Sequence, residues 1–242
     1  MNPCILLPTY NDRGTIAEMV ASLLQFQYPV IIVNDGSDEE TRSIINALAD
    51  SYETVTAVHR STNGGKGAAV ADGIAKAFSL GCSHAIQLDA DNQHCVDDIP
   101  RFVAAAKDAP HALIMGTPVF GPDVPRARLI GRRISCFWVV LETLSFSIKD
   151  PLFGFRMYPV TETHALLSAS RIGLRMDFDP EIAVRLYWKG LEVVSIPSAV
   201  RYPEGGVSRF RLFEDNVRIS WMHTRLFIGM FFRLPRLVRR WF

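Results

Sequence analysis

Two aspartates lie two positions apart in the segment Gln-Leu-Asp-Ala-Asp-Asn-Gln-His, residues 87–94. Because side chains alternate along an extended chain, Asp89 and Asp91 are expected to point the same way at the end of a strand. Two like charges there need a cation, and carboxylate oxygens favour Mg²⁺ or Mn²⁺, with Gln93 able to add a carbonyl oxygen or a hydrogen bond. The same residues also suit a polar turn that caps the following helix, so the pair alone leaves both interpretations open.

Polar loops with nucleotide-binding chemistry follow three other predicted strands. Asp35, in the turn Asn-Asp-Gly-Ser, could accept hydrogen bonds from a nucleobase or a ribose hydroxyl, although a plain Asp-Gly turn explains it as well. Tyr10, after the first strand, could stack on a base. Lys66 follows Asn-Gly-Gly and opens a helix whose N-terminal amides could attract phosphate, or it simply solvates the helix start.

The glycine cluster at 63–67 fits neither standard nucleotide motif. A Walker loop needs glycine at position 60 and Ser or Thr after the lysine, where this chain has Arg60 and Gly67. A GxGxxG fingerprint that starts at Gly65 fails at Val70. Kinase-like and Rossmann dehydrogenase functions therefore lose support.

Short β-branched runs alternate with helical periodicity through the first 120 residues. Several runs are continuously apolar, as in strands buried on both faces of a parallel sheet. Repeated strand, helix, strand predicts a doubly wound, mostly parallel α/β sheet that binds its ligands at the carboxyl edge. The predicted strands are 5–9, 30–34, 55–59, 85–89 and 112–117, with helices at 14–26, 38–51, 66–80 and 98–107.

After position 125 the pattern changes, and a helix with a basic start comes first. No linker rich in Gly or Ser divides the chain, which favours one domain over residues 1–210 with two specialised halves, 1–120 and 121–210, and a tail at 211–242. The elements predicted in the second half are a helix at 126–148, a short stretch at 150–158, helices at 161–169 and 179–189, and a strand at 192–202.

The composition supports a folded protein, because 48% of its 242 residues are apolar and 21% are charged. Its four cysteines fit neither a metal knuckle nor a dense disulfide framework, which favours a reducing, cytoplasmic location. We expect no signal peptide, and no apolar run approaches the roughly 20 residues of a membrane span. Residues 1–125 hold 7 Lys and Arg against 15 Asp and Glu, whereas residues 126–242 hold 19 against 10, which predicts a basic half that meets an anionic partner unless the charges intermix in space.

The C-terminal segment interleaves arginines with aromatic residues, and at 100° per residue the arginines fall within about a 120° arc. This pattern favours peripheral contact with the inner face of the cell membrane, where each arginine near anionic lipid contributes about 1 kcal/mol. A helix packed on the domain with solvated arginines is the alternative; an RNA-binding strip would need a recognition motif that is not found, so no nucleic acid is expected. Pro235 is expected to break the helix. The arginines are Arg218, Arg225, Arg233, Arg236, Arg239 and Arg240.

Four motifs occur in a fixed order along the chain: Pro-Thr-Tyr-Asn-Asp at 8–12, Val-Asn-Asp-Gly-Ser at 33–37, Asp-Ala-Asp-Asn-Gln-His at 89–94 and Asp-Pro-Leu-Phe-Gly-Phe-Arg at 150–156. Together they resemble family 2 glycosyltransferases of the GT-A fold, most closely the branch of dolichyl-phosphate mannosyltransferases. The resemblance covers roughly residues 3–210 and is more specific than any single motif. It implies a nucleotide-sugar donor and a divalent metal. Nucleotidyltransferases share a related sheet, but this chain lacks their glycine-rich N-terminal loop.

The resemblance also implies roles for individual residues. Four of them resemble the family's contacts to the donor base and ribose: Pro8, Tyr10, Asp12 and Asp35. Four resemble its metal and diphosphate site: Asp89, Ala90, Asp91 and Gln93. Arg201 and Arg209 are similar to the basic residues on the loop that closes over the diphosphate, although Gly-Gly-Val-Ser-Arg stands here in place of the Glu-Ser-Lys turn common in that branch.

For an inverting transfer, the acceptor oxygen attacks the anomeric carbon on the side opposite the departing diphosphate. A hydroxyl acceptor needs a general base, for which Asp177, Asp179 and Glu181 are candidates, although helix capping also explains them; a phosphate acceptor is already ionised and needs none. Arg156 could hold a phosphate or pair with Asp150. The sequence therefore predicts a metal-dependent transferase that uses a lipid-linked acceptor such as polyprenyl phosphate. The alternatives are a hydroxyl on a glycolipid or other glycan, and a membrane-associated nucleotide-binding protein without turnover.

Overall fold

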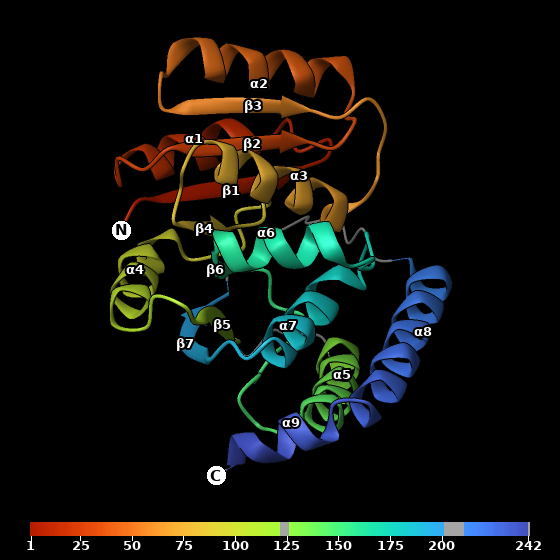
Figure 1. Cartoon of the computed structure of the whole chain (residues 1–242). Helices are drawn as coiled ribbons and strands as arrows, with labels where there is room; N and C mark the ends of the chain where they lie inside the picture. The colour runs from red at the N-terminus through yellow and green to blue at the C-terminus, as the bar shows by residue number, and fades with distance from the viewer. Residues whose placement is uncertain (122–125, 201–210, 242) are drawn as a thin grey trace.

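The computed structural model describes residues 1–121, 126–200 and 211–241, which form one seven-stranded sheet flanked by helices (Figure 1). The strand order is β3-β2-β1-β4-β6-β5-β7. All strands run parallel except β6, which is antiparallel to both of its neighbours, β4 and β5. This confirms the predicted mostly parallel α/β sheet. The strands are β1 (Pro3–Thr9), β2 (Val30–Asn34), β3 (Val55–His59), β4 (His84–Gln87), β5 (Leu113–Val119), β6 (Arg156–Pro159) and β7 (Val193–Ala199).

Helices cover both faces of the sheet because the strands are apolar on both sides. In β1, Ile5 and Leu7 join one buried cluster with residues of α1, α2 and α4, whereas Leu6 joins the other with residues of α3, α6, α7 and α8. The helices are α1 (Ile16–Leu24), α2 (Glu39–Ser51), α3 (Lys66–Ser79), α4 (Ile99–Asp108), α5 (Arg126–Thr143), α6 (Val160–Ala169), α7 (Phe178–Trp188), α8 (Leu212–Phe231) and α9 (Leu234–Val238), with short 3₁₀ turns at Val96–Asp98 and Arg239–Trp241.

Two elements differ from the sequence prediction. The helix predicted over 126–148 ends at Thr143, because Leu144 adopts a left-handed backbone conformation with φ of 50° that cannot continue a helix. The stretch at 150–158 contains a strand, β6, that was not predicted. Its sequence, Arg-Met-Tyr-Pro, is fully buried although it starts with a charge, so neither alternation nor an apolar run marks it.

The C-terminal segment packs on the domain through α8, which contacts α5 and α7 and buries Met222 and Leu226. As predicted, Pro235 marks a break, since it lies in the first turn of the separate helix α9. Within the described ranges, none of the helices has the length and apolar composition needed to cross a membrane.

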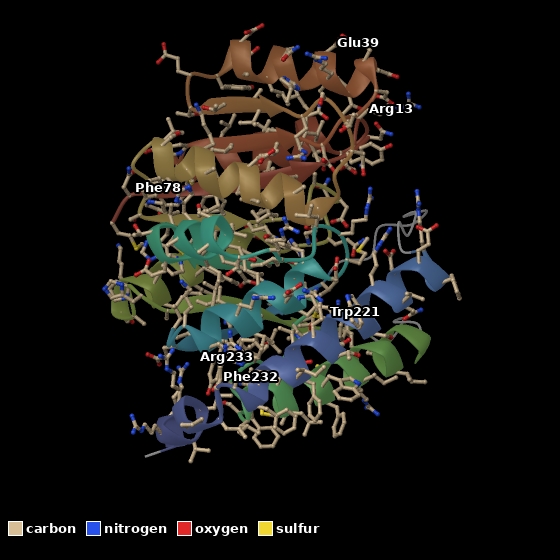
Figure 2. All side chains as sticks on the ribbon, turned by 45° about the vertical axis from the view of Figure 1, so that its right-hand side comes forward. Arg13, Glu39, Phe78, Trp221, Phe232 and Arg233 are labelled. Carbon is tan, nitrogen blue, oxygen red and sulfur yellow. The ribbon has the colours of Figure 1, made fainter. Side chains whose placement is uncertain are left out.

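The arginines of this segment are placed differently from the predicted lipid-facing arc. Arg225 donates to Glu181 at 3.0 Å, Arg218 pairs with Asp215 at 3.4 Å, and Arg233 lies over the Trp188 ring. Large apolar side chains are exposed on and just after α8 instead, among them Trp221, which is 62% exposed, and Phe232, which follows the helix and is 82% exposed (Figure 2). A helical projection shows which residues share an arc but not which arc faces the domain.

Glycine at position 67 allows the start of α3 to approach the start of α7. A Cβ added to Gly67 would lie 2.6 Å from the Cβ of Phe178, and the Gly67 amide donates to the carbonyl of Leu174 at 2.9 Å. Real Cβ atoms do not approach that closely, so any side chain here would push the two helices apart.

Gly67→Ala is therefore expected to lower the free energy of unfolding by about 1–3 kcal/mol, the usual cost of overpacking a core. Gly131→Ala is the matched control, because Gly131 lies exposed in α5 with no atom within 4 Å of an added Cβ. The control should gain about 0.5–1 kcal/mol from the better helix propensity of alanine. Urea unfolding followed by circular dichroism measures both, and a Gly67→Ala variant as stable as the wild type would contradict the close packing.

Candidate active site

The polar loops predicted from the sequence leave the same edge of the sheet. Thr9, Asn34 and His59, at the ends of β1, β2 and β3, lie in register, and Gln87 at the end of β4 pairs with Leu6. The segments that follow these strands therefore emerge side by side at the carboxyl edge, which is where α/β sheets bind ligands.

The centre of this edge is a lysine between two carboxylates. The ammonium nitrogen of Lys66 lies 2.6 Å from Oδ1 of Asp89 and 2.8 Å from Oδ2 of Asp179. The three residues come from the start of α3, the turn after β4 and the first turn of α7. We call this arrangement the Lys66 cluster.

Charge pairing overcomes burial in the Lys66 cluster. Burial by itself would lower the pKa of Lys66, but the charges of Asp179 and Asp89 raise it above its ordinary range. Burial by itself would raise the pKa of Asp179, but Lys66 and Arg156 lower it. Lys66 and Asp179 are therefore charged at neutral pH.

Asp91 follows in a turn that is fixed at both sides. The carbonyl of Ala90 accepts from the Thr15 hydroxyl at 2.6 Å, and Oδ1 of Asp91 accepts from the amide of Gln93 at 3.1 Å. Burial first, and then the charge of Asp89, raise the pKa of Asp91 from 3.8 to about 6. Within the described residues, no cation pairs with Asp91 as Lys66 pairs with Asp89.

His94 supports this turn from behind. Its Nδ1 accepts from the backbone amide of Asp89 at 3.1 Å, and its ring packs on Phe153 and Phe155. Burial lowers the pKa of His94 to about 4, so the ring is neutral and suited to accept. No role for His94 was predicted from the sequence; its position five residues after Asp89 was the available signal.

Asp35 is buried and makes its contacts within the protein. Its two carboxylate oxygens accept from the amides of Gly64 at 2.9 Å and Gly65 at 2.7 Å, and Oδ1 lies 2.9 Å from Nε of Arg60. These glycine amides, expected to attract phosphate, are thus satisfied by a carboxylate. Arg60 stands where a Walker loop would need glycine, and no role was predicted for it. Its backbone amide donates to the carbonyl of Asn34, next to the last pair of the β2–β3 register.

The loop after β1 is closed by Asp12. Its Oδ2 accepts from the Thr9 hydroxyl at 2.9 Å and from the Tyr10 amide at 3.0 Å, which shapes the turn around Tyr10. Pro8 is buried within β1, opposite Val33 of β2. Asp12 is also one of the charges that raise the pKa of Asp91, so the two loops are neighbours.

Arg156 is fully buried and holds backbone rather than facing open space. Its guanidinium donates to the carbonyls of Pro151, Phe153 and Asp179. The alternative partner, Asp150, pairs with Arg132 at 2.6 Å instead. In this structure Arg156 therefore positions the 151–155 segment and the start of α7, and a phosphate could reach it only if those bonds broke.

Glycine at 154 lets that segment lie against the Lys66 cluster. A Cβ added there would meet Nζ of Lys66 at 2.5 Å and Oδ2 of Asp89 at 2.6 Å. The motif at 89–94 and the motif at 150–156 are thus brought into direct contact, although the second motif begins 56 positions after the first one ends.

The three candidate bases, all within the described ranges, have different surroundings. Asp179 belongs to the Lys66 cluster. Asp177 accepts from the amide of Arg175 at 3.1 Å and closes a local turn, and Glu181 is fully buried between Arg185 and Arg225. Asp179 is thus the candidate that reaches the Asp89 side of the sheet. Arg201 and Arg209 lie outside the described residues.

The carboxylates fit a divalent ion that also binds phosphate oxygens. In the part of the chain that the structure describes, no three His, Cys, Asp or Glu side chains surround a common point. Mg²⁺ and Mn²⁺ need only one or two carboxylates when substrate phosphates and waters complete the shell. Besides burial, the charge of Asp89 raises the pKa of Asp91, so the two carboxylates repel each other, and a divalent ion would offset that repulsion.

Comparison with known proteins gives one family. The model described as "Glycosyl transferase family 2" matches residues 4–168. The chain is 23% identical over 222 residues to UDP-N-acetylglucosamine–dolichyl-phosphate N-acetylglucosaminyltransferase of Methanococcus voltae, covering 85% of this chain and 88% of the relative. It is 28% identical over 214 residues to polyprenol monophosphomannose synthase of Mycolicibacterium smegmatis, covering 85% and 79%.

Solved structures agree on the fold. The mannosyltransferase PcManGT of Pyrobaculum calidifontis, in complex with GDP-Man and Mn²⁺, is similar with a TM-score of 0.62 and 16% identity, covering 98% of this chain and 73% of that one. Glucosyl-3-phosphoglycerate synthase of Mycobacterium tuberculosis, in complex with Mn²⁺, UDP-Glc and phosphoglyceric acid, gives 0.65 and 15%, covering 95% and 79%. At this identity the likeness shows the fold, which is GT-A.

The shifted Asp91 predicts a stability difference that depends on pH. Asp91→Asn is expected to raise the free energy of unfolding of the metal-free protein at pH 8, because it removes a charge that the native state disfavours. Two pKa units correspond to about 3 kcal/mol for a fully buried group, which partial exposure reduces to about 1–2 kcal/mol. The gain should be complete above pH 6, shrink as the pH falls from 6 toward 3.8 and vanish below, where Asp91 is neutral in both states.

Asp97→Asn is the control, since Asp97 is exposed in the following turn. Urea unfolding at several pH values measures the difference. An Asp91→Asn variant that is less stable than the wild type at pH 8 would show that Asp91 has a cationic partner after all.

Proposed function

The chain belongs to glycosyl transferase family 2 and is a glycosyltransferase, and from this premise we propose that it moves a sugar from a nucleotide-diphosphate donor to a lipid-linked phosphate such as polyprenyl phosphate. The relatives whose names include dolichyl-phosphate or polyprenol support the acceptor class, and the neighbours solved with nucleotide sugars support the donor class. The choice of a phosphate acceptor rests on the lowered pKa of Asp179, which pairs with Lys66.

Asp179 is a poor general base in its present surroundings. Lys66 and Arg156 hold its pKa below the ordinary value, whereas an effective base has a pKa near the working pH. Asp177 and Glu181 are occupied by a local turn and by two arginines. None of these three described candidates is therefore suited to deprotonate a hydroxyl acceptor, but an ionised phosphate needs no base. This favours the phosphate acceptor over a hydroxyl of a glycolipid or other glycan.

The donor is proposed to lie across the carboxyl edge of β1, β2 and β4. Pro8, Tyr10, Asp12 and Asp35 would surround its base and ribose, with Arg60 beside Asp35 as an added contact. Asp91, Asp89 and Gln93 would hold a divalent ion, which when bound offsets the negative charge that builds on the departing diphosphate.

Lys66 is proposed to hold Asp89 and Asp179 together through its two ion pairs until the donor arrives. Its ammonium group can then turn toward the diphosphate, because a lysine head group moves freely on its stem. From the resemblance, we also propose that Arg201 and Arg209 contact the diphosphate.

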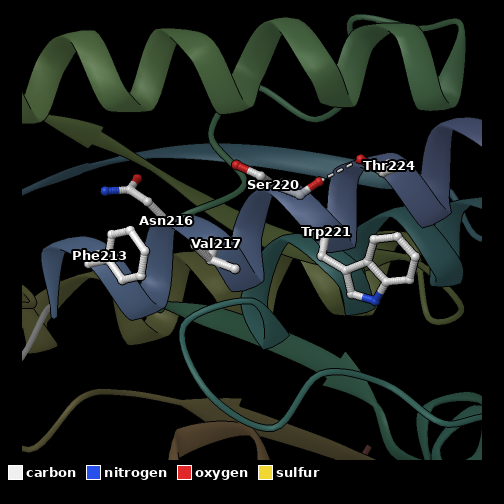
Figure 3. A pocket seen from close by; sticks show the side chains of 6 residues that line it. All are labelled: Phe213, Asn216, Val217, Ser220, Trp221 and Thr224. Carbon is white, nitrogen blue, oxygen red and sulfur yellow. Dashed lines mark hydrogen bonds between the residues drawn. The ribbon is translucent and has the colours of Figure 1, made fainter.

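We also propose peripheral contact with the inner face of the cell membrane. The outward side of α8 carries Phe213, Val217 and Trp221 along a shallow hollow of about 570 Å³ (Figure 3). The neighbouring α5 exposes Ile134 and Phe137. Such apolar side chains suit the boundary between headgroups and acyl chains, where a lipid-linked acceptor presents its phosphate. The four free cysteines are consistent with a reducing compartment.

A panel of nucleotide sugars with Mn²⁺ or Mg²⁺ tests the donor half. A matching donor at about 100 times its Kd should add about 2.7 kcal/mol and raise the Tm by about 5–10 °C. Asp91→Asn should lose this metal-dependent rise, whereas Asp97→Asn should keep it. No stabilisation by any donor in the panel would contradict the transferase proposal and favour a protein without turnover.

Asp179→Asn tests the acceptor half, with polyprenyl phosphate and a glycolipid offered as separate acceptors. With the phosphate acceptor, kcat should fall less than tenfold and keep its pH profile, because no proton is removed by Asp179. A general base would contribute about 10²- to 10⁴-fold. A loss of that size, together with loss of the acidic limb of the pH profile, would favour the hydroxyl acceptor. Asp177→Asn is the control from the same turn.

A further inference from the structure

A second hollow, which is lined mainly by polar side chains, lies at the opposite end of α7 from the Lys66 cluster. It has a volume of about 590 Å³ and is bordered by the ends of α6 and α7 and by α9. Asp179 and Trp188 are nine positions apart in α7, which at a rise of 1.5 Å per residue is about 14 Å. The hollow is thus distinct from the proposed donor site.

Five cationic side chains line this hollow, and none of the described residues that line it is acidic. Figure 2 shows Arg233 beside the exposed Phe232 at the end of α8. The five cations are Arg185, Lys189, Arg233, Arg236 and Arg240. We call this hollow the basic hollow.

Two of the arginines are held in place without losing their charge. Arg233 lies 4.4 Å from the centre of the Trp188 ring and donates to the carbonyl of Gly229 at 2.7 Å. Arg240 lies 3.9 Å from the centre of the Tyr187 ring and donates to the carbonyl of Leu191 at 2.8 Å. The other terminal nitrogen of Arg240 donates to the carbonyl of Tyr187. Rings and carbonyls orient a guanidinium but do not neutralise it, so each arginine keeps its charge in a fixed position and has further N–H groups that can donate to an anion.

The other three cations are also poorly compensated. Arg185 pairs with Glu181 at 2.7 Å, but Glu181 is shared with Arg225. Lys189 and Arg236 have no side-chain hydrogen bond or ion pair within the described residues. Burial, and then the charges of Arg185 and Arg236, lower the pKa of Arg233, as expected for cations that crowd one another.

Helix ends do not account for so much positive charge. Three helices end near the basic hollow, namely α6, α7 and α8, and each C-terminus is equivalent to about −0.5 charge. Together with the shared Glu181 this gives about −2.5 against five cations. The remaining charge of about +2.5 is enough to balance one phosphate group, which carries about −1.5 to −2 near neutral pH as a monoester.

We propose that the basic hollow is a binding site for one phosphate group, held by the forks of Arg233 and Arg240 and by Lys189 and Arg236. The group belongs either to a lipid headgroup or to a free phosphate compound. Binding at this site requires neither the sugar donor nor the acceptor. Only the lipid headgroup as a source of the phosphate depends on the proposed membrane contact.

The test compares a Lys189→Gln/Arg236→Gln double variant with the wild type. Both side chains are exposed, so the substitutions should not disturb the fold. An Arg42→Gln/Lys107→Gln double variant is the matched control, because these residues are exposed on α2 and α4 and change the net charge equally. Two probes are used at constant ionic strength and without nucleotide: inorganic phosphate, followed by calorimetry, and phosphatidylcholine vesicles with and without phosphatidylglycerol, followed by sedimentation.

The double variant should bind its anion about 30-fold more weakly than the wild type, which corresponds to about 2 kcal/mol for two cations, and the control should bind like the wild type. Variant-sensitive binding of inorganic phosphate identifies a free phosphate compound. Variant-sensitive binding of phosphatidylglycerol vesicles, with no binding of inorganic phosphate, identifies a lipid headgroup. Equal binding by the double variant and the wild type with both probes, or equal losses in the double variant and the control, would overturn the proposal.

These outcomes are independent of the transferase proposal. Thermal stabilisation by a donor and Mn²⁺ can be measured on the same double variant, and it should equal that of the wild type. A failed phosphate test with intact donor stabilisation would overturn the basic hollow alone, whereas the reverse result would overturn the donor site alone.

Discussion

The ion pairs of Lys66 with Asp89 and Asp179 hold together the parts of the chain that form the candidate active site. They join the start of α3, the turn after β4 and the first turn of α7. Two unit charges 4 Å apart attract by about 4 kcal/mol at an effective dielectric constant of 20, but moving them out of water costs a comparable amount. The cluster therefore adds little net stability. Its effect is specificity, because losing one partner would leave another charge buried and unpaired.

Close backbone contacts make this arrangement possible. Gly67 lets α3 meet Phe178 of α7, and Gly154 lets the 151–155 segment lie on Lys66 and Asp89. Arg156 then fixes that segment and α7 through three carbonyls. The cluster and the glycines depend on one another: the ion pairs need the short distances, and the short distances tolerate no side chain at either glycine. A donor complex that supplied Asp89 with a divalent ion would keep the charge balanced while freeing Lys66 for the diphosphate.

Much of the fold could be predicted from the sequence, because the first half consists of strands buried on both faces between amphipathic helices. The loops after β1, β2 and β4 were predicted at one edge for the same reason. The strand β6 could not be predicted, since its buried Arg156 is compensated by carbonyls that lie elsewhere in the sequence. The contacts of Asp35 with the glycine amides and with Arg60 could not be predicted either. Whether a carboxylate binds backbone amides or a ligand depends on how two loops meet in space.

The helix α7 carries acidic residues at its start and basic residues at its end. Its first turn holds Asp179 and Glu181, and Arg185 with the following Lys189 lies at its other end, which is the order that the helix dipole favours. Local pairing satisfies the acidic end, where Lys66, Arg156 and Arg225 reach the carboxylates. No equivalent set of carboxylates reaches the basic end among the residues that line it. The two ends thus differ in kind: one is an ion-paired centre, whereas at the other the described residues that line the hollow carry a surplus of positive charge.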